Sequence, residues 1–315
     1  MVVNLHDEVR ANKRKSIFVI MSFFLFVIVL GFVAGLVFLG VSGGVFSVYS
    51  GLVGAVFAFV LSLIYMMIFM STGDKMILSV TGATLASRSE YPYLYHTTEA
   101  LSLAAGLKTP PKCYIIKDNA LNAYATGFTP EKSYIVVTTG LIDKLNREEL
   151  EGVLAHEMSH IKNSDIKVML IAAGLVGVTV LISDMLFRMF IFAPRSGGGR
   201  DNDSNDKLKI VFILVGVLLV ILSPIIAQLI KLAISRKREY LADSTGALLT
   251  RYPEGLASAL EKIKNSHIPL QNANKATAHL FISNPLKDGK QFLSSMFSTH
   301  PPIEDRIKRL RGIKG

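Results

Sequence analysis

The stretch Ala155-His156-Glu157-Met158-Ser159-His160 contains the pattern His-Glu-x-x-His. Residues four apart lie on the same face of an α-helix, so His156 and His160 can reach one point in space. Two neutral imidazoles at this spacing suit a zinc ion, and Glu157 beside them is placed to accept a proton from an attacking water. The sequence therefore predicts a zinc centre here, against the alternative of two surface histidines on an ordinary helix.

The residues around this stretch indicate a helix. Apolar side chains recur at helical intervals, at Leu150, Val153, Leu154 and Ile161. Asn146 followed three residues later by Glu149 matches a capping box, so we expect the helix to begin just after Asn146. The polar run Asn163-Ser164-Asp165 should end this helix and can cap the next one.

Composition indicates a membrane protein. Half of the 315 residues are hydrophobic, and the mean hydropathy is +0.43. The single cysteine, Cys113, excludes an intramolecular disulfide and a cysteine-rich zinc site. The net charge of +10 would suit a nucleic-acid binder, but the basic residues cluster beside apolar segments and no nucleic-acid motif accompanies them. We therefore expect no nucleic-acid partner.

Four apolar segments predict about four transmembrane helices. They cover residues 17–39, 45–70, 168–192 and 210–230. The first is too long for the apolar part of a signal peptide, and a second follows at once, so we expect no cleavage. Gly31 and Gly35 form a GxxxG pattern that can let the first two helices approach closely. Asp184 and Arg188 are spaced to pair on one helix face, and an interfacial ion pair is the favoured interpretation.

Basic residues flank these segments on one side. They are Arg10, Lys13, Arg14 and Lys15 before the first segment, and Lys231, Arg236, Lys237 and Arg238 after the fourth. The positive-inside rule then predicts a multi-pass protein of the cell membrane (inner or plasma membrane) with both termini and the zinc domain in the cytoplasm. The expected parts are a transmembrane hairpin at 1–72, a domain formed by 73–165 and 231–315, and a second hairpin at 166–230 inserted into that domain.

The cytoplasmic domain is predicted to be α+β, mostly helical with a small β-sheet. We expect a short strand at 75–80, a helix at 91–105 and β-rich runs at 112–117 and 134–139. Helices are also predicted at 231–250, from Pro253 to about residue 265, and at the basic C-terminal end.

The stretch Asn119-Ala-Leu-Asn-Ala-Tyr-Ala-Thr-Gly127 lies between the two β-rich runs and is small, polar and extended. One interpretation is a solvent-facing edge strand with no further role. The other is an edge that pairs with an extended substrate peptide. In that case Asn119, Asn122, Ala123 and Tyr124 would be the substrate-binding residues.

A catalytic zinc needs a third protein ligand beside an open position for water. Four other histidines lie in segments without site-like neighbours and are expected at the surface: His6, His96, His267 and His279. Glu239 is a better candidate, because Asp243 follows one helical turn later on the same face. Asp243 could accept a hydrogen bond from a ligand histidine and fix its tautomer. The alternative for Glu239 is a surface ion pair with Arg236.

These motifs together resemble the HtpX family of membrane zinc metalloproteases, which are related to the CAAX prenyl proteases. The resemblance covers nearly the whole chain. It rests on His156-Glu157-x-x-His160, Arg238-Glu239-Tyr240-Leu241-Ala242-Asp243, Ser298-Thr299-His300-Pro301-Pro302 with Arg306, the 119–127 stretch and the opening hairpin. Family members are gluzincins, whose third ligand is a glutamate. The resemblance implies one Zn2+ per chain on His156, His160 and Glu239, with Glu157 catalytic. It also implies cleavage of misfolded or damaged membrane proteins, often under stress.

The C-terminal motif offers two further candidates. His300 is the candidate donor to the oxyanion that develops during peptide hydrolysis. Arg306 is expected either to donate beside it or to position Asp243. The alternative for His300 is a loop histidine that merely precedes two prolines.

The expected function is that of a membrane zinc endopeptidase acting on polypeptides, with membrane proteins as substrates and the lipid bilayer as its surroundings. One rival is a membrane zinc-binding scaffold without proteolytic activity, but an inactive site has no need of Glu157 as a base. A transporter or channel is the other rival. Charges deep in the apolar segments would favour it, and only Asp184 and Arg188 occur there.

Overall fold

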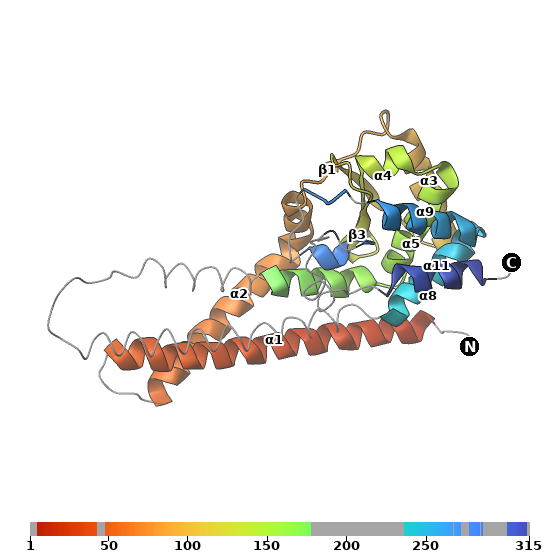
Figure 1. Cartoon of the computed structure of the whole chain (residues 1–315). Coiled ribbons are helices and arrows are strands. Elements are labelled where there is room, and N and C mark those ends of the chain that lie inside the picture. Colours follow the sequence, from red (N-terminus) through yellow and green to blue (C-terminus); the bar gives the residue numbers. More distant parts are fainter. Residues whose placement is uncertain are drawn as a thin grey trace. The chain divides into compact units, whose positions relative to one another are not determined.

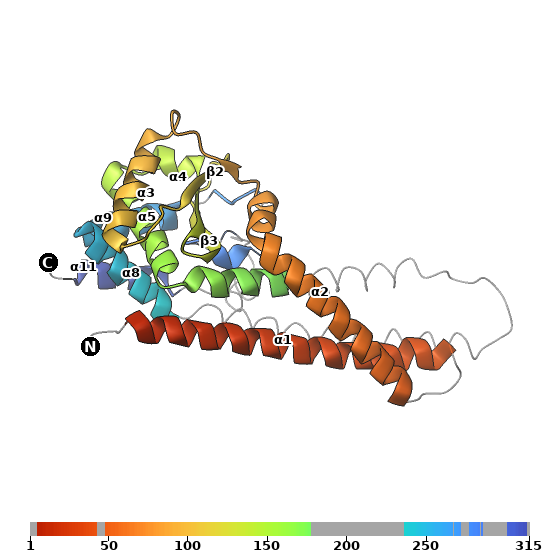
Figure 2. The same cartoon turned by 180° about the vertical axis from the view of Figure 1, so that it is seen from behind.

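The computed structural model describes residues 5–42, 48–177, 236–266, 268–271, 277–283, 285 and 301–313 (Figure 1; Figure 2 shows the opposite side). The chain divides into two compact units, which are described separately. One unit contains Met1–Ser16, Thr72–Ala173 and Ile230–Gly315, and the other contains Ile17–Ser71 and Gly174–Leu229.

The second unit contains a hairpin of two long helices. Helix α1 spans Leu5–Ser42 and α2 spans Val48–Val80, and both continue beyond this unit. Gly31 and Gly35 of α1 lie directly against Gly54 of α2, where an added Cβ atom would come within 2.3 Å of the Gly31 carbonyl oxygen. The close approach that the GxxxG pattern predicts is therefore confirmed.

Among the described residues, α2 is the one helix long and apolar enough to cross a membrane. Helix α1 contributes a shorter apolar stretch, Ile20–Leu36. Large apolar side chains on α2 are exposed, for example Phe57 at 65% and Met67 at 62%, as expected for a lipid-facing helix. The other two predicted spans, with Asp184 and Arg188, lie largely or wholly outside the described residues, so the number of four spans stays a prediction.

The strand expected at 75–80 is wrong, because α2 continues as a helix through Val80. Contacts within the first unit stabilise the helical conformation of this segment. Ile77 and Leu78 are buried, and the Asp74 carboxylate accepts a hydrogen bond from the Tyr134 hydroxyl at 2.9 Å. Such tertiary contacts outweigh the weak β-preference of a short apolar run.

A mixed four-stranded sheet forms the β part of the first unit. Its strands are β1 (Thr84–Leu85), β2 (Lys112–Ile116), β3 (Ala123–Thr129) and β4 (Lys132–Thr138), in the order β1-β2-β4-β3. Strand β4 is parallel to β2 and antiparallel to β3. The β-rich runs are confirmed, and the edge position is confirmed for residues 123–127 of the 119–127 stretch. Solvent does not reach this edge strand along residues 123–126, which are buried.

Helices pack around the sheet and around one central helix. They are α3 (Pro92–Ala105), α4 (Thr139–Lys144), α5 (Arg147–Lys162), α8 (Arg236–Thr250), α9 (Pro253–Asn265), the short η1 (Ala278–Leu280) and α11 (Ile303–Arg311). Helix α5 contacts α3, α8 and α9, and it also contacts β3 and β4 of the sheet (Figure 1, Figure 2). The helix that carries His-Glu-x-x-His is therefore the core of the unit.

Local sequence explains how α5 is placed. The predicted capping box is present, with 2.8 Å hydrogen bonds in both directions between Asn146 and Glu149. A turn at Ser164, whose φ is 57°, ends α5 and a further helix occupies residues 165–177. Gly246 of α8 lies against the backbone of His156, with 3.1 Å from an added Cβ to the His156 nitrogen. This close approach brings the acidic side chains of α8 to the histidines.

Candidate metal centre

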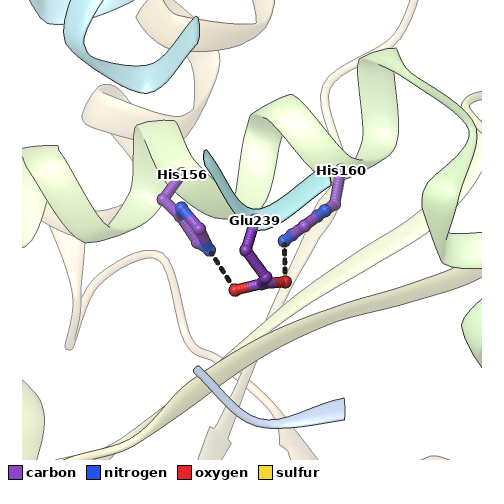
Figure 3. Close-up of side chains that lie close together, drawn as sticks. All are labelled: His156, His160 and Glu239. Carbon is purple, nitrogen blue, oxygen red and sulfur yellow. Dashed lines mark ion pairs between the residues drawn. The ribbon is translucent and has the colours of Figure 1, made fainter. Parts of the chain in front are cut away.

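The structure brings His156, His160 and Glu239 together, as Figure 3 shows. Nε2 of His156 lies 3.9 Å from one Glu239 carboxylate oxygen, and Nε2 of His160 lies 3.5 Å from the other. One ligand atom from each residue lies within 4.8 Å of the other two, and all three side chains are buried. The arrangement is that of a three-ligand site with two imidazoles and one carboxylate.

The other ring nitrogen of His156 faces a second acidic residue. Nδ1 of His156 lies 3.0 Å from Asp243, one turn after Glu239 on α8. Arg306 of α11 donates two hydrogen bonds to the Asp243 carboxylate, at 2.7 and 2.9 Å, and lies 3.5 Å from Glu239. The Arg306 side chain is fully buried. These contacts put Arg306 where it can hold Asp243, one of the two roles expected for it.

His160 has a corresponding partner that the sequence did not reveal. Its Nδ1 lies 3.1 Å from Asp165, which is buried at the start of the 165–177 helix. Asp165 in turn lies 3.4 Å from a guanidinium nitrogen of Arg238. The sequence indicated Asp165 only as a cap, and Arg238 as a basic flank and part of a motif without a role of its own, but both side chains are buried.

Glu157 lies on the same helix with its carboxyl group buried. Burial raises the pKa of Glu157 to about 7, and the charge of Glu239 acts in the same direction. The charges of His160 and Arg306 and a hydrogen bond from the Ala125 backbone on β3 partly oppose this rise. A carboxyl group with a pKa near neutrality can both accept and return a proton at physiological pH.

The two histidines experience different fields. Burial, followed by the charge of Arg306, lowers the pKa of His156 to about 4 despite Asp243. Burial also lowers the pKa of His160, but the hydrogen bond that its ring donates to Asp165 and the charges of Glu239, Asp165 and Glu157 outweigh this effect and raise the pKa to about 9. The carboxylates that favour a proton on His160 also favour a metal cation at the same place.

The buried charges of the centre match a divalent cation. Glu157, Asp165, Glu239 and Asp243 are buried carboxyl groups, and Arg238 and Arg306 are buried guanidinium groups. When all six are ionised and both histidines are neutral, as metal-binding imidazoles are, four negative and two positive charges leave two negative charges unbalanced. Burying unbalanced charge is costly, and one Zn2+ would neutralise it. The donor set of two imidazoles and one carboxylate also suits zinc.

Comparison with known proteins identifies the family. The family model described as "Peptidase family M48" matches residues 88–314. The chain belongs to peptidase family M48. It is 50% identical over 238 residues to the "Protease HtpX homolog" of Dictyoglomus thermophilum, covering 76% of this chain and 75% of that protein. It is 42% identical over 312 residues to the "Protease HtpX homolog" of Streptococcus uberis, covering 98% and 99%. A solved structure, the "Crystal Structure of S. mikatae Ste24p", matches with a TM-score of 0.48 and 22% identity, covering 80% of this chain and 57% of that chain.

Membership of the M48 family confirms the resemblance to HtpX proteases and makes this chain a membrane-associated metalloprotease. M48 peptidases depend on zinc, so the cofactor is Zn2+. The scaffold without proteolytic activity is not favoured.

The remaining predicted residues are placed as follows. Ala123 and Tyr124 are buried at the start of β3 and Asn122 is buried just before it, whereas Asn119 is exposed. His300 lies outside the described residues, as does His267. His96 is exposed as expected, but the expectation for His279 is wrong. His279 is buried, and its Nε2 lies 3.0 Å from the Met169 carbonyl, a contact across 110 positions that spacing does not reveal.

Proposed function

We propose that this chain is a membrane-embedded zinc endopeptidase whose metal is held by His156, His160 and Glu239. One observation carries the proposal: both histidine Nε2 atoms face the same buried Glu239 carboxylate, in a chain of the M48 family. The metal would polarise the scissile carbonyl and make a bound water acidic.

Glu157 acts as the proton carrier of the reaction. It takes a proton from the attacking water and returns it to the leaving amine. Its place beside the ligands and its pKa near 7 support this role. His300 remains our candidate for stabilising the oxyanion, and Arg306 acts through Asp243, which fixes the His156 tautomer.

The substrate peptide pairs with the outer edge of β3. This strand lies at the end of the sheet, and the Ala125 backbone on it contacts Glu157. Part of the edge is already used, because Ile282 donates its N–H to the Ala123 carbonyl at 2.9 Å. The Asn122 side chain likewise exchanges hydrogen bonds with the Ser283 backbone, at 2.9 and 3.3 Å. Substrate would therefore pair from Ala125 onwards, by backbone hydrogen bonds.

A protease that binds its substrate through backbone hydrogen bonds can accept many sequences. We therefore assign misfolded or damaged membrane proteins as substrates, in a quality-control or stress role. The protease domain, formed by 73–165 and 231–315, would lie in the cytoplasm with both termini. Reporter fusions test this topology. A fusion after Gly315 should report cytoplasm, and one within residues 197–205 should report the opposite side. A cytoplasmic signal from the second fusion would mean that 168–192 and 210–230 do not both span.

One experiment tests the function itself. Detergent-purified protein should cleave casein or an unfolded membrane protein, lose this activity with a zinc chelator and regain it when Zn2+ is returned. The variant Glu157→Gln should keep its zinc but be inactive, because the proposed ligands remain while the base is gone. Zinc content measured by elemental analysis beside activity decides this. Substantial activity in Glu157→Gln would refute the assigned mechanism, and zinc binding without any cleavage by the unmodified chain would support the scaffold.

A further inference from the structure

His156 and His160 are supported in the same way, each by an aspartate and an arginine. At His160 the aspartate is Asp165, 3.1 Å from Nδ1, and the arginine is Arg238, 3.4 Å from the other Asp165 oxygen. We propose that Asp165, held by Arg238, is the positioning residue that prepares His160 to bind the metal. This inference rests on the ligand set proposed above.

The geometry at His160 gives its two ring nitrogens different tasks. Nδ1 faces Asp165 and Nε2 faces Glu239. A carboxylate beside a ring nitrogen favours the tautomer with the proton on that nitrogen. Asp165 therefore keeps the proton on Nδ1 and leaves the Nε2 lone pair free for the metal, and it also stops the ring from turning over.

The chain must break its helix to bring Asp165 to His160. On a continuous α-helix, residues five apart point about 140° away from each other, so these side chains could not meet. Here α5 ends at Lys162, and Ser164 adopts the left-handed conformation with φ 57°. The new helix that follows begins at Asp165, whose side chain lies almost fully buried against His160. The turn at Ser164 therefore both ends α5 and brings the Asp165 carboxylate to His160.

Arg238 links this support to the third ligand. It immediately precedes Glu239 on α8, and both side chains are buried although they contact different groups. A buried carboxylate needs a counter-charge, which Arg238 gives to Asp165. The position of α8 therefore sets the Glu239 ligand and the support of His160 together. Arg238, which the sequence placed among the basic residues flanking a membrane segment, is thus a buried residue that pairs with Asp165.

The test uses the full chain, purified in detergent and loaded with zinc. Zinc release into an excess of chelator is followed with a metal-sensitive dye, and the visible absorption of the Co2+-substituted protein reports ligand geometry. Asp165→Ala should release zinc ~10–100-fold faster and change the Co2+ spectrum. Asp165→Asn should show a smaller effect, because its amide oxygen can still accept the imidazole proton.

Asp74→Ala is the matched control. Asp74 is also a buried aspartate, but its carboxylate accepts a hydrogen bond from the Tyr134 hydroxyl, and neither residue is a proposed metal ligand. This variant should lose stability yet release zinc as the unmodified protein does. Asp165→Asn keeps the side-chain volume, so it remains informative even if Asp165→Ala does not fold.

A double variant tests the role of Arg238. If Arg238 acts through Asp165, Asp165→Ala with Arg238→Ala should release zinc no faster than Asp165→Ala alone. If the double variant instead releases zinc faster than Asp165→Ala by the factor that Arg238→Ala causes alone, Arg238 does not act through Asp165. Zinc release and a Co2+ spectrum unchanged in Asp165→Ala, or matched by the Asp74→Ala control, would overturn the proposal itself. Full zinc retention in His160→Ala would instead refute the underlying ligand set, so the two failures can be told apart.

Discussion

The hydroxyl groups of Tyr124 and Thr81 lie 2.6 Å apart, and both side chains are buried. Thr81 directly follows α2, and Tyr124 lies on β3, so the contact joins the end of this helix to the edge strand. The Tyr124 ring also packs edge-on against Phe281 at 4.9 Å between centroids. The Tyr124 side chain therefore supports β3 from within the core, and we assign it a positioning role in the proposed substrate edge.

Tyr124→Phe should destabilise the protein by about 1 kcal/mol, the usual net contribution of one hydrogen bond. The loss stays small because the Thr81 hydroxyl keeps its 2.9 Å bond to the Ile77 carbonyl. Tyr124→Ala should cost about 3–5 kcal/mol, because it also removes a fully buried ring. Unfolding followed by circular dichroism in detergent measures both. Loss of zinc from Tyr124→Phe would contradict a role confined to the strand.

Glu239→Ala should lose both zinc and activity, because two histidines alone hold the metal poorly. Asp243→Ala should be milder, with ~10–100-fold weaker zinc binding or activity, since Asp243 acts through His156. Elemental analysis after dialysis against a chelator measures metal retention. Glu254→Ala is the control, because Glu254 pairs with Arg311 at the surface. Full zinc occupancy in Glu239→Ala would show that another residue is the third ligand.

Gly54→Val should disrupt the packing of α1 on α2. A Cβ at Gly54 meets backbone atoms of Gly31 and Gly35 at 2.3 and 2.6 Å, and backbone atoms cannot move aside cheaply. We expect a loss of about 1–3 kcal/mol, typical of overpacking. Gly51→Ala is the control, because the three atoms nearest to its added Cβ all belong to the ring of Phe32, which can rotate. Thermal stability in detergent distinguishes them, and equal stability of the two variants would rule out the close helix crossing.

Substrates with blocked backbone groups test the proposed pairing with β3. Replacing a substrate amide N–H that pairs with the edge by N-methyl should slow cleavage by about 2- to 10-fold, the equivalent of one hydrogen bond. A scan of single N-methyl groups along one peptide should affect alternate residues, because successive residues of a strand face opposite ways. Cleavage rates by mass spectrometry decide it. Equal rates across the scan would exclude strand pairing.

The sequence predicted well what depends on local spacing. The capping box at Asn146 and the two histidines four positions apart on α5 both follow from helical periodicity. The crossing at Gly31 and Gly35 follows from a short motif. In each case the deciding residues are neighbours on one element, so no knowledge of the tertiary structure is needed.

The features missed from the sequence depend on contacts between distant elements. Residues 75–80 have the composition of a strand, but packing of Ile77 and Leu78 keeps them helical. Arg238 and Asp165 are 73 positions apart, and they meet where α8 packs on α5, which ends just before Asp165. The bonding of Arg306 to Asp243 spans 63 positions, and the sequence could offer it only as one of two alternatives.

Within the part of the chain that the structure describes, the contact of Ile282 with Ala123 occupies one end of the β3 edge. Catalysis is proposed beside Ala125, so an incoming chain can be held as a strand towards Gly127 but meets the enzyme's own backbone towards Ala123. After cleavage the two products are then unequal. The fragment on the Gly127 side keeps its hydrogen bonds to β3 and dissociates slowly. The other fragment forms no such hydrogen bonds and dissociates faster. Product inhibition would come from one half of each cut peptide, and turnover would be limited by release of that half.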